Sequence, residues 1–178
     1  MHLDCGSCIV RNWTLGDQSS LVRLADNRNV WRNLTHRFPN PYTDADADSW
    51  LGLQVQKSVS NNWAIEIDGV AAGGIGIEPG EGVFAKSARF GYWLGEPYWG
   101  RGIMTAAVRA TVDHVFSRFD LVRLEAPVFE WNPASMRVLE KCGFVREGVL
   151  RRSIFKDGQI IDAVLYARVR KGDIPNYR

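Results

Sequence analysis

The chain has 178 residues, of which 46% are hydrophobic and 24% are charged, and its formal net charge is +2. This composition is typical of a globular protein and excludes a disordered chain, while so small a net charge gives no support for nucleic-acid binding. No apolar run reaches the roughly eighteen residues that a membrane-spanning helix needs. We therefore expect one domain over residues 1–178, with a core that forms without disulfides or a metal, and no membrane partner.

The cysteines and the N-terminus bear on the cellular compartment. An odd number of cysteines, three, argues against a disulfide framework and fits a reducing cytoplasm. The opening MHLDCGSCIV lacks the basic stretch and apolar core of a secretion signal. Cys5 and Cys8 form a C-x-x-C pair, but no second ligand pair and no thioredoxin-like helix accompanies it. We expect a cytoplasmic protein with no metal site and no role for this pair.

The first third of the chain predicts one short strand and then helices. Residues 8–14 alternate well enough for a strand, and residues 15–34 carry apolar side chains at the spacing of one or two short helices. After the break at FPNPY, residues 43–58 predict a helix that opens with a threonine and acids suited to its N-terminus. Capping is therefore the favoured role of Asp44, Asp46 and Asp48, with binding of a cationic substrate as the alternative.

The periodicity then changes to that of strands. Residues 62–78 predict a hairpin with a type I′ turn at Asp68 and Gly69, and residues 87–94 predict a further strand. Residues 104–119 place apolar side chains on one stripe of a helix, and residues 121–129 predict another strand. Because a helix joins these two strands, we expect them to be parallel within an otherwise antiparallel sheet, an α+β or mixed α/β architecture.

The last third predicts a short helix and a closing hairpin. Asn132 is suited to cap the helix, Pro133 to its first position, and Gly143 to its end. Residues 145–169 form two strand-like runs around the turn KDGQ. From Arg146 onward there are eight Lys or Arg residues against four acids. This basic third could face an anionic ligand, although a solvated surface is the favoured explanation.

A glycine turn lies where the strand at residues 87–94 passes into the next helix. Gly100 and Gly102 flank Arg101 immediately before that helix. The first N–H groups of a helix lack intrahelical partners, its dipole favours negative charge, and Arg101 adds a permanent cation. The P-loop pattern is absent, and GGIGIEPG has Pro79 where the dinucleotide fingerprint needs its third glycine. The turn predicts a phosphate site, and a simple tight turn before a helix is the alternative.

A second landmark, FEWNPASMRVLEKCGFVREG, follows the strand that we expect to be parallel to residues 87–94. If these strands diverge, a cleft opens with the glycine turn on one wall and the helix at NPAS on the other. Together, YWGRGIMTAAV and NPASMRVLEKCGFVREGVLR resemble the GNAT superfamily of N-acetyltransferases, in its RimJ/RimL-like branch, over about residues 8–170. The resemblance implies a mostly antiparallel seven-stranded sheet with one parallel splayed strand pair, flanked by about four helices.

The resemblance also implies acetyl-coenzyme A as the acetyl donor and no metal. Its pyrophosphate would lie on the backbone of the glycine turn, and its pantetheine would pair with the preceding strand like an added strand. Trp99 and Met104 depart from the general family pattern but are common in this branch. The implied cofactor-binding residues are Tyr92, Trp93, Leu94, Trp99, Gly100, Arg101, Gly102, Ile103, Met104, Thr105, Asn132 and Ser135.

The catalytic residues are less clearly marked. Many family members carry a tyrosine seven residues after the motif asparagine, as the acid for the leaving thiolate, but this chain has Leu139 there. Members of the branch carry a serine three residues after the asparagine, so Ser135 is the candidate to protonate or orient the thiol. Bonding of Ser135 to its own helix start is the alternative. Glu130 is the candidate general base, with a solvated loop acid as the favoured alternative, and Glu66 and Asp162 are weaker candidates.

The acceptor side is placed in residues 30–50 and on the strand before the turn. Its candidate substrate-binding residues are Trp31, Phe38, Tyr42 and Phe90, although core packing is the default role of each ring alone. The function expected is acetyl transfer to a primary amine, foremost the α-amino group of a peptide N-terminus. The alternatives are a small amine such as an amino acid, polyamine or antibiotic, and a non-catalytic CoA-binding module. A homodimer is compatible with the sequence, and no nucleic-acid partner is expected.

Overall fold

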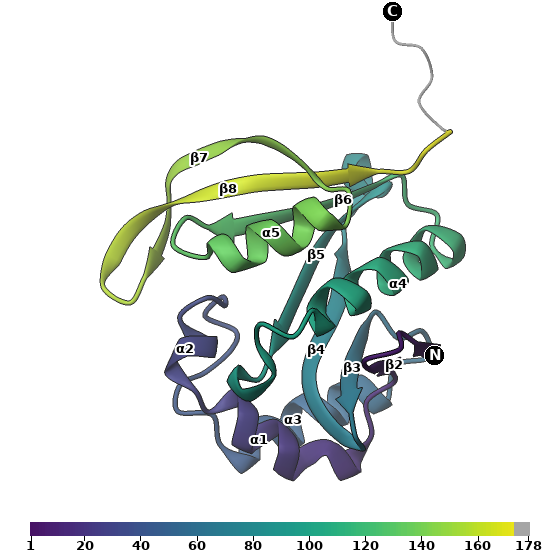
Figure 1. The fold of residues 1–178 in the computed structure, drawn as a ribbon, viewed down its shortest axis with the longest axis vertical. Coiled ribbons are helices and arrows are strands. Elements are labelled where there is room, and N and C mark those ends of the chain that lie inside the picture. The colour runs from purple at the N-terminus through teal and green to yellow at the C-terminus, as the bar shows by residue number, and fades with distance from the viewer. Residues whose placement is uncertain (173–178) are drawn as a thin grey trace, which may run out of the picture. The chain divides into compact units, whose positions relative to one another are not determined.

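A computed structural model describes residues 1–172 (Figure 1). The α-helices are α1 (Gln18–Ala25), α2 (Arg28–Trp31), α3 (Asp44–Val55), α4 (Ile103–Arg118) and α5 (Pro133–Lys141). The strands are β1 (His2–Asp4), β2 (Ile9–Arg11), β3 (Asn62–Ile67), β4 (Val70–Pro79), β5 (Ser87–Leu94), β6 (Arg123–Phe129), β7 (Val145–Lys156) and β8 (Gln159–Val169). The 3-10 turns are η1 (Leu15–Asp17), η2 (Gly82–Phe84) and η3 (Glu96–Tyr98). Within the described residues, no helix is both long and apolar enough to cross a membrane.

The strands form one sheet in the order β1-β2-β3-β4-β5-β6-β8-β7. β5 and β6 pair in parallel, and the pairs β1–β2, β2–β3, β3–β4, β6–β8 and β7–β8 are antiparallel. The expected mixed architecture with one parallel pair is thus confirmed. The described sheet has eight strands rather than seven, because His2–Asp4 pairs with Ile9–Arg11. Three residues are too few to show alternation in a sequence, so no pattern predicts β1.

The chain forms two compact units, and it passes from one to the other inside β4, β5 and α4. Unit 1 comprises residues 1–76 and 91–111, and unit 2 comprises residues 77–90 and the described residues from 112 onward. The expectation of a single domain over residues 1–178 stays a prediction.

The core of unit 1 forms where α1 and α3 pack with β3 and β4. Its buried members are Trp13, Leu21, Ala25, Tyr42, Ala47, Leu51, Ala64 and Ala71. In β4, a Cβ on Gly73 would lie 2.4 Å from the carbonyl oxygen of Trp93, and one on Gly74 would lie 2.7 Å from Nε1 of the same residue. The glycines that fail the dinucleotide pattern therefore serve to admit the β5 backbone and the Trp93 indole.

Local turn and capping chemistry follows the sequence closely. Thr43 and Asp46 close a capping box at the start of α3, and Asp44 accepts a hydrogen bond from Nε2 of Gln18 at 3.0 Å. Asp68 and Gly69 have φ of 49° and 79°, as a type I′ turn requires. The predicted capping of α3 and the predicted turn between β3 and β4 are both confirmed.

Unit 2 contains β6, β8 and β7, with α5 between β6 and β7 in the sequence. Leu139 of α5 is fully buried, and Phe90 packs against Phe144 with ring centroids 5.7 Å apart. Arg168 donates from Nη1 to the carbonyl oxygen of Cys142 at 2.7 Å, which ties β8 to the end of α5. These contacts fix α5 relative to β8.

Candidate active site

The glycine turn joins β5 to α4 within unit 1. Gly100 and Gly102 adopt φ of 74° and 78°, a region that strains other residues, and α4 begins at Ile103. The indole Nε1 of Trp99 donates to the carbonyl oxygen of Leu94 at 2.7 Å, bridging the loop back to the end of β5. Trp99, predicted from the sequence as a cofactor-binding residue, therefore holds the turn closed.

The turn presents backbone to the surface. Gly100, Arg101 and Gly102 are exposed, and no atom lies within 4 Å of a Cβ built on either glycine. Ile103 and Met104 are buried, so their side chains face the core instead of a ligand. The guanidinium of Arg101 lies 5.8 Å from the Tyr98 ring centroid. An open backbone at a helix N-terminus beside a cation fits a pyrophosphate group.

The strand that leads into the turn has a short parallel pairing. The β5–β6 ladder runs from Ser87–Arg123 to Arg89–Glu125, while β5 continues to Leu94. Past the ladder, the Gly95 N–H donates to the Ala72 carbonyl oxygen at 2.8 Å, on the β4 side of β5. The parallel strands thus pair only over their first residues, as expected. Pairing of pantetheine with Tyr92, Trp93 and Leu94 stays a prediction.

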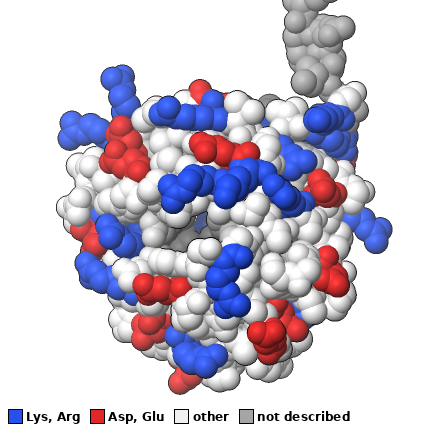
Figure 2. Space-filling model, in the orientation of Figure 1, with Lys and Arg blue, Asp and Glu red and all other residues white. Residues whose placement is uncertain are grey.

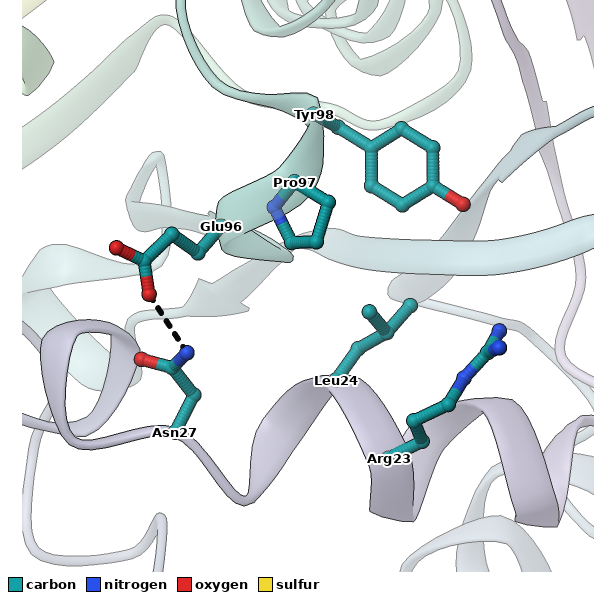
Figure 3. Close-up of a pocket in the computed structure, with 6 residues that line it drawn as sticks. All are labelled: Arg23, Leu24, Asn27, Glu96, Pro97 and Tyr98. Atoms are coloured by element: carbon teal, nitrogen blue, oxygen red, sulfur yellow. Dashed lines mark hydrogen bonds between the residues drawn. The ribbon is translucent and has the colours of Figure 1, made fainter.

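A pocket of about 300 Å³ lies beside the glycine turn in unit 1 (Figure 3). Its lining residues are Arg23, Leu24, Asn27, Glu96, Pro97 and Tyr98. Nδ2 of Asn27 donates to Glu96 at 2.7 Å, and Nδ2 of Asn29 donates to both Glu96 oxygens at 3.0 and 3.1 Å. Hydrogen bonds from Asn27 and Asn29 lower the pKa of Glu96 and favour its ionised form. Glu96 therefore ties the start of α2 to η3.

Asn132 and Ser135 form the start of α5 in unit 2. Oδ1 of Asn132 accepts from the Ser135 backbone N–H at 3.1 Å, which confirms the predicted N-cap. The Ser135 backbone N–H is therefore part of the cap. The roles of Ser135 as thiol-orienting residue and of Asn132 in cofactor binding stay predictions.

The three candidate bases are engaged in hydrogen bonds. Glu130 accepts from the Asp162 N–H at 3.0 Å through Oε1, and its own N–H donates to the Asp162 carbonyl oxygen at 3.1 Å. Asp162 accepts in turn from the Arg152 N–H at 2.7 Å, and Glu66 pairs with Arg11 in unit 1. These contacts give each carboxylate a structural role. General-base catalysis by Glu130 stays a prediction.

Of the four aromatic candidates, Phe38 packs against the end of β5. Its ring centroid is 5.4 Å from that of Trp93 and 5.0 Å from that of Tyr42. Tyr42 is buried, and burial raises the pKa of its hydroxyl to about 12. Phe90 is also buried, and Trp31 is half-buried with Arg28 over its ring at 5.9 Å. Core packing accounts for Tyr42 and Phe90, the default role that their residue type suggests.

Sequence reasoning missed two features beside these candidates. One is the link from Asn27 and Asn29 to Glu96, which joins residues 69 and 67 positions apart in the chain. The side chain of Asn27 also accepts from the N–H groups of Asn29 and Val30, so a capping rule applied to residues 27–30 could have found the start of α2. The other is a bulge in β7, for which no local pattern gives a signal.

Comparison with protein families identifies the chain. A model of the acetyltransferase (GNAT) domain matches residues 8–145. The chain belongs to the GNAT acetyltransferase family. Among solved structures it is similar to RimL, a ribosomal L7/L12 α-N-protein acetyltransferase in complex with coenzyme A. The TM-score is 0.81 at 22% identity, covering 95% of this chain and 98% of that one, which confirms the GNAT fold.

The names of the relatives point to more than one kind of acceptor. This GNAT chain is 47% identical to YjcK of Bacillus subtilis, named a probable N-acetyltransferase, over 73 residues, 41% of this chain and 40% of the relative. It is 36% identical to the ribosomal-protein-serine acetyltransferase of Escherichia coli over 84 residues, 47% of each chain. A spermidine N(1)-acetyltransferase of Vibrio cholerae is 24% identical over 149 residues, 83% of this chain and 84% of that one. The chain spans less than half the length of the first two relatives, and the RimJ/RimL-like branch fits these matches.

Proposed function

We propose that this GNAT protein transfers the acetyl group of acetyl-CoA to the α-amino group of a peptide or protein N-terminus. The glycine turn supports acetyl-CoA as the acetyl donor, because its exposed backbone at the N-terminus of α4 suits the pyrophosphate of coenzyme A. Similarity to a ribosomal-protein-serine acetyltransferase supports a protein N-terminus as the acceptor. A cytoplasmic location and a homodimer stay predictions, and all three cysteines are free thiols.

Acetyl-CoA would supply a thioester carbonyl that a neutral amine can attack. The backbone N–H groups of Tyr92, Trp93 and Leu94 are the candidates to stabilise the oxyanion, and the Ser135 hydroxyl is the candidate to protonate the leaving thiolate. Glu130 is the candidate to accept the proton of the amine, directly or through water. Among the described residues, no group of three His, Cys, Asp or Glu side chains could hold a metal ion.

The choice of a peptide N-terminus over a polyamine rests on the hydrogen bonds that the acidic residues at the start of α3 form. A polyamine carries several positive charges and needs carboxylates that are available to pair with it. Asp46 is committed to the capping box with Thr43, and Asp44 accepts from Gln18. Two of the three carboxylates in this cluster therefore build the helix start, and only the exposed Asp48 lies outside these contacts. A peptide N-terminus, with one positive charge that is lost before attack, makes no such demand.

A thiol-release assay with acetyl-CoA tests the proposal. The acceptors are peptides with free N-termini, the same peptides with blocked N-termini, free amino acids, and spermidine. We expect CoA release only with free N-terminal peptides, and mass spectrometry should place the acetyl group on the α-nitrogen. Faster turnover of spermidine than of every peptide would overturn the choice of acceptor. Tight CoA binding, measured calorimetrically, without turnover on any acceptor would instead support a non-catalytic CoA-binding module.

A further inference from the structure

β7 contains a three-residue bulge opposite Asp162 of β8. Leu150 pairs with Ala163 and Ile154 pairs with Ile161, so three β7 residues face the single residue Asp162. Those three are Arg151, Arg152 and Ser153. Figure 1 shows β7 arching away from β8 before it runs into the hairpin. Bulges of this kind re-aim side chains and are common next to functional sites.

The bulge is held in a fixed conformation despite its strain. Arg152 has φ of 50°, a left-handed conformation that costs an arginine energy. Its N–H donates to Oδ1 of Asp162 at 2.7 Å, and Oγ of Ser153 donates to the Leu150 carbonyl oxygen at 2.9 Å. A strained non-glycine backbone that its neighbours hold in place is a recurring feature of functional sites.

The same contacts fix the bulge near the start of α5. The N–H of Asp162, whose side chain holds Arg152, donates to Oε1 of Glu130 at 3.0 Å. Glu130 follows directly on β6 and stands two residues before the capping residue Asn132. The bulge therefore lies at the carboxyl end of β6, within unit 2. In sheets with parallel strands, ligands bind beyond the carboxyl ends of those strands.

The bulge carries two cations that the described residues leave without a counter-ion. Arg151 and Arg152 are exposed, and neither forms an ion pair with any described residue. Elsewhere in unit 2, Arg123 pairs with Glu147 at 2.6 Å. Asp162, which accepts from the Arg152 N–H of the bulge, and Glu130, which accepts from the Asp162 N–H, are bonded to backbone groups instead. Figure 2 shows further Lys and Arg side chains on the face around α5, where Arg137 and Lys141 are exposed.

We propose that the Arg151–Arg152 bulge binds a carboxylate of the acceptor, so that the preferred substrate is a peptide with an acidic side chain shortly after its N-terminal residue. This inference rests on the proposed function and names the substrate class within it. The arginine guanidinium suits the purpose, because its planar donors match a carboxylate and its charge persists at any working pH. Two arginines on a fixed backbone bind such a group with little loss of backbone freedom.

The test compares a peptide carrying Asp or Glu at its second to fourth positions with the isosteric Asn or Gln peptide. The readout is the ratio of kcat/KM for the acidic peptide to that for the amide peptide. For the unmodified protein we expect a ratio of roughly four to twenty-five, because each of two exposed charge pairs contributes roughly two- to fivefold. Arg151→Gln and Arg152→Gly should each lower the ratio, with the change in KM rather than kcat. The glycine keeps the backbone conformation of the bulge and removes only the side chain.

Two further variants separate charge recognition from a structural effect. Arg146→Gln removes an exposed cation from the same strand but outside the bulge, and it should leave the ratio unchanged. Arg151→Glu should invert the preference, so that a lysine-containing peptide becomes better than the acidic one.

The outcomes distinguish this inference from the proposed function on which it rests. Equal ratios for the unmodified protein and both bulge variants would overturn the inference while leaving N-terminal acetylation standing. A fall in the ratio for Arg146→Gln as large as that for the bulge variants would also overturn it, because general surface charge would then explain the preference. Absence of turnover on every peptide would instead contradict the proposed function.

Discussion

The glycine turn of unit 1 and the arginine bulge of unit 2 share a backbone conformation, but one exposes backbone N–H groups and the other exposes charged side chains. Both hold residues at positive φ, Gly100 and Gly102 in the turn and Arg152 in the bulge. In the turn the glycines remove side chains so that backbone N–H groups face a ligand. In the bulge an arginine adopts the strained conformation, and its charged side chain is exposed. Under the two proposals, donor recognition uses groups that every residue carries, and acceptor recognition uses side chains that can vary.

The two regions also differ in what fixes them. Glu96 beside the turn is held by the side-chain amides of Asn27 and Asn29, whereas Asp162 at the bulge holds a backbone N–H of Arg152. A side-chain link can be lost while the turn keeps its glycine geometry. Loss of Asp162 removes the contact that holds Arg152 in its strained conformation. We therefore expect the turn to be sensitive to backbone substitutions and the bulge to be sensitive to carboxylate substitutions.

The largest expected effect is on the turn. Gly102→Pro cannot keep φ of 78°, and it deletes one N–H of the cradle, so we expect CoA affinity to fall by more than a hundredfold, about 3 kcal/mol. Isothermal titration calorimetry with CoA measures this. Gly102→Ala retains the N–H and meets no steric clash, so its loss should be near tenfold, from about 1–2 kcal/mol of strain.

Gly82→Ala is the matched control for these variants. Gly82 also has a positive φ, 57°, and open space around its Cβ position, but it lies in η2, outside the turn. Its CoA affinity should equal that of the unmodified protein. If Gly102→Pro folds, as judged by circular dichroism, and binds CoA normally, the cradle assignment is wrong.

The features that the sequence predicts differ from those that it does not in how far apart their residues lie in the chain. The turn, the capping box at Thr43, the turn at Asp68 and the N-cap at Asn132 depend on neighbours a few residues apart, so local patterns predict all of them. The parallel strand pair follows from the connecting helix. The bulge and the Glu96 link join residues far apart in the chain, so no local pattern contains them. For the same reason, the sequence suggests Glu130 as a base without showing its bond to Asp162.

A second prediction concerns catalysis without a change in donor binding. Ser135→Ala should lower kcat by about thirtyfold, because a thiolate still leaves, though more slowly, without a general acid. CoA affinity and the free energy of unfolding should change little, since alanine keeps the backbone N–H that residue 135 donates to the α5 cap. Steady-state kinetics and calorimetry on the same preparation measure both quantities.

Ser49→Ala, on the exposed side of α3, is the control for loss of a helical serine hydroxyl. It should leave kcat and stability as they are. Unchanged kcat in Ser135→Ala would reduce Ser135 to a residue of the helix start and remove it from the mechanism.

A third prediction concerns the bulge. Asp162→Ala removes the acceptor for the Arg152 N–H, and it should lower the free energy of unfolding by about 1.5 kcal/mol, the typical value for a hydrogen bond to a charged group. Urea denaturation measures this loss. The selectivity for acidic over amide peptides should fall together with stability, because Arg152 loses its fixed position. A variant with full selectivity would show that the arginines act independently of the bulge geometry.

The smallest expected effect is the pH dependence of the link beside the turn. Hydrogen bonds from Asn27 and Asn29 lower the pKa of Glu96 below its ordinary 4.5, so the ionised form stabilises the folded state. This contribution is fully present above pH 4.5 and is lost as the pH falls through the lowered pKa. Glu96→Gln should therefore be slightly less stable than the unmodified protein at neutral pH, and urea denaturation across the acid range should show the difference vanishing. A difference that stays constant down to the acid limit would mean that the amides of Asn27 and Asn29 recognise the shape of the side chain and not its charge.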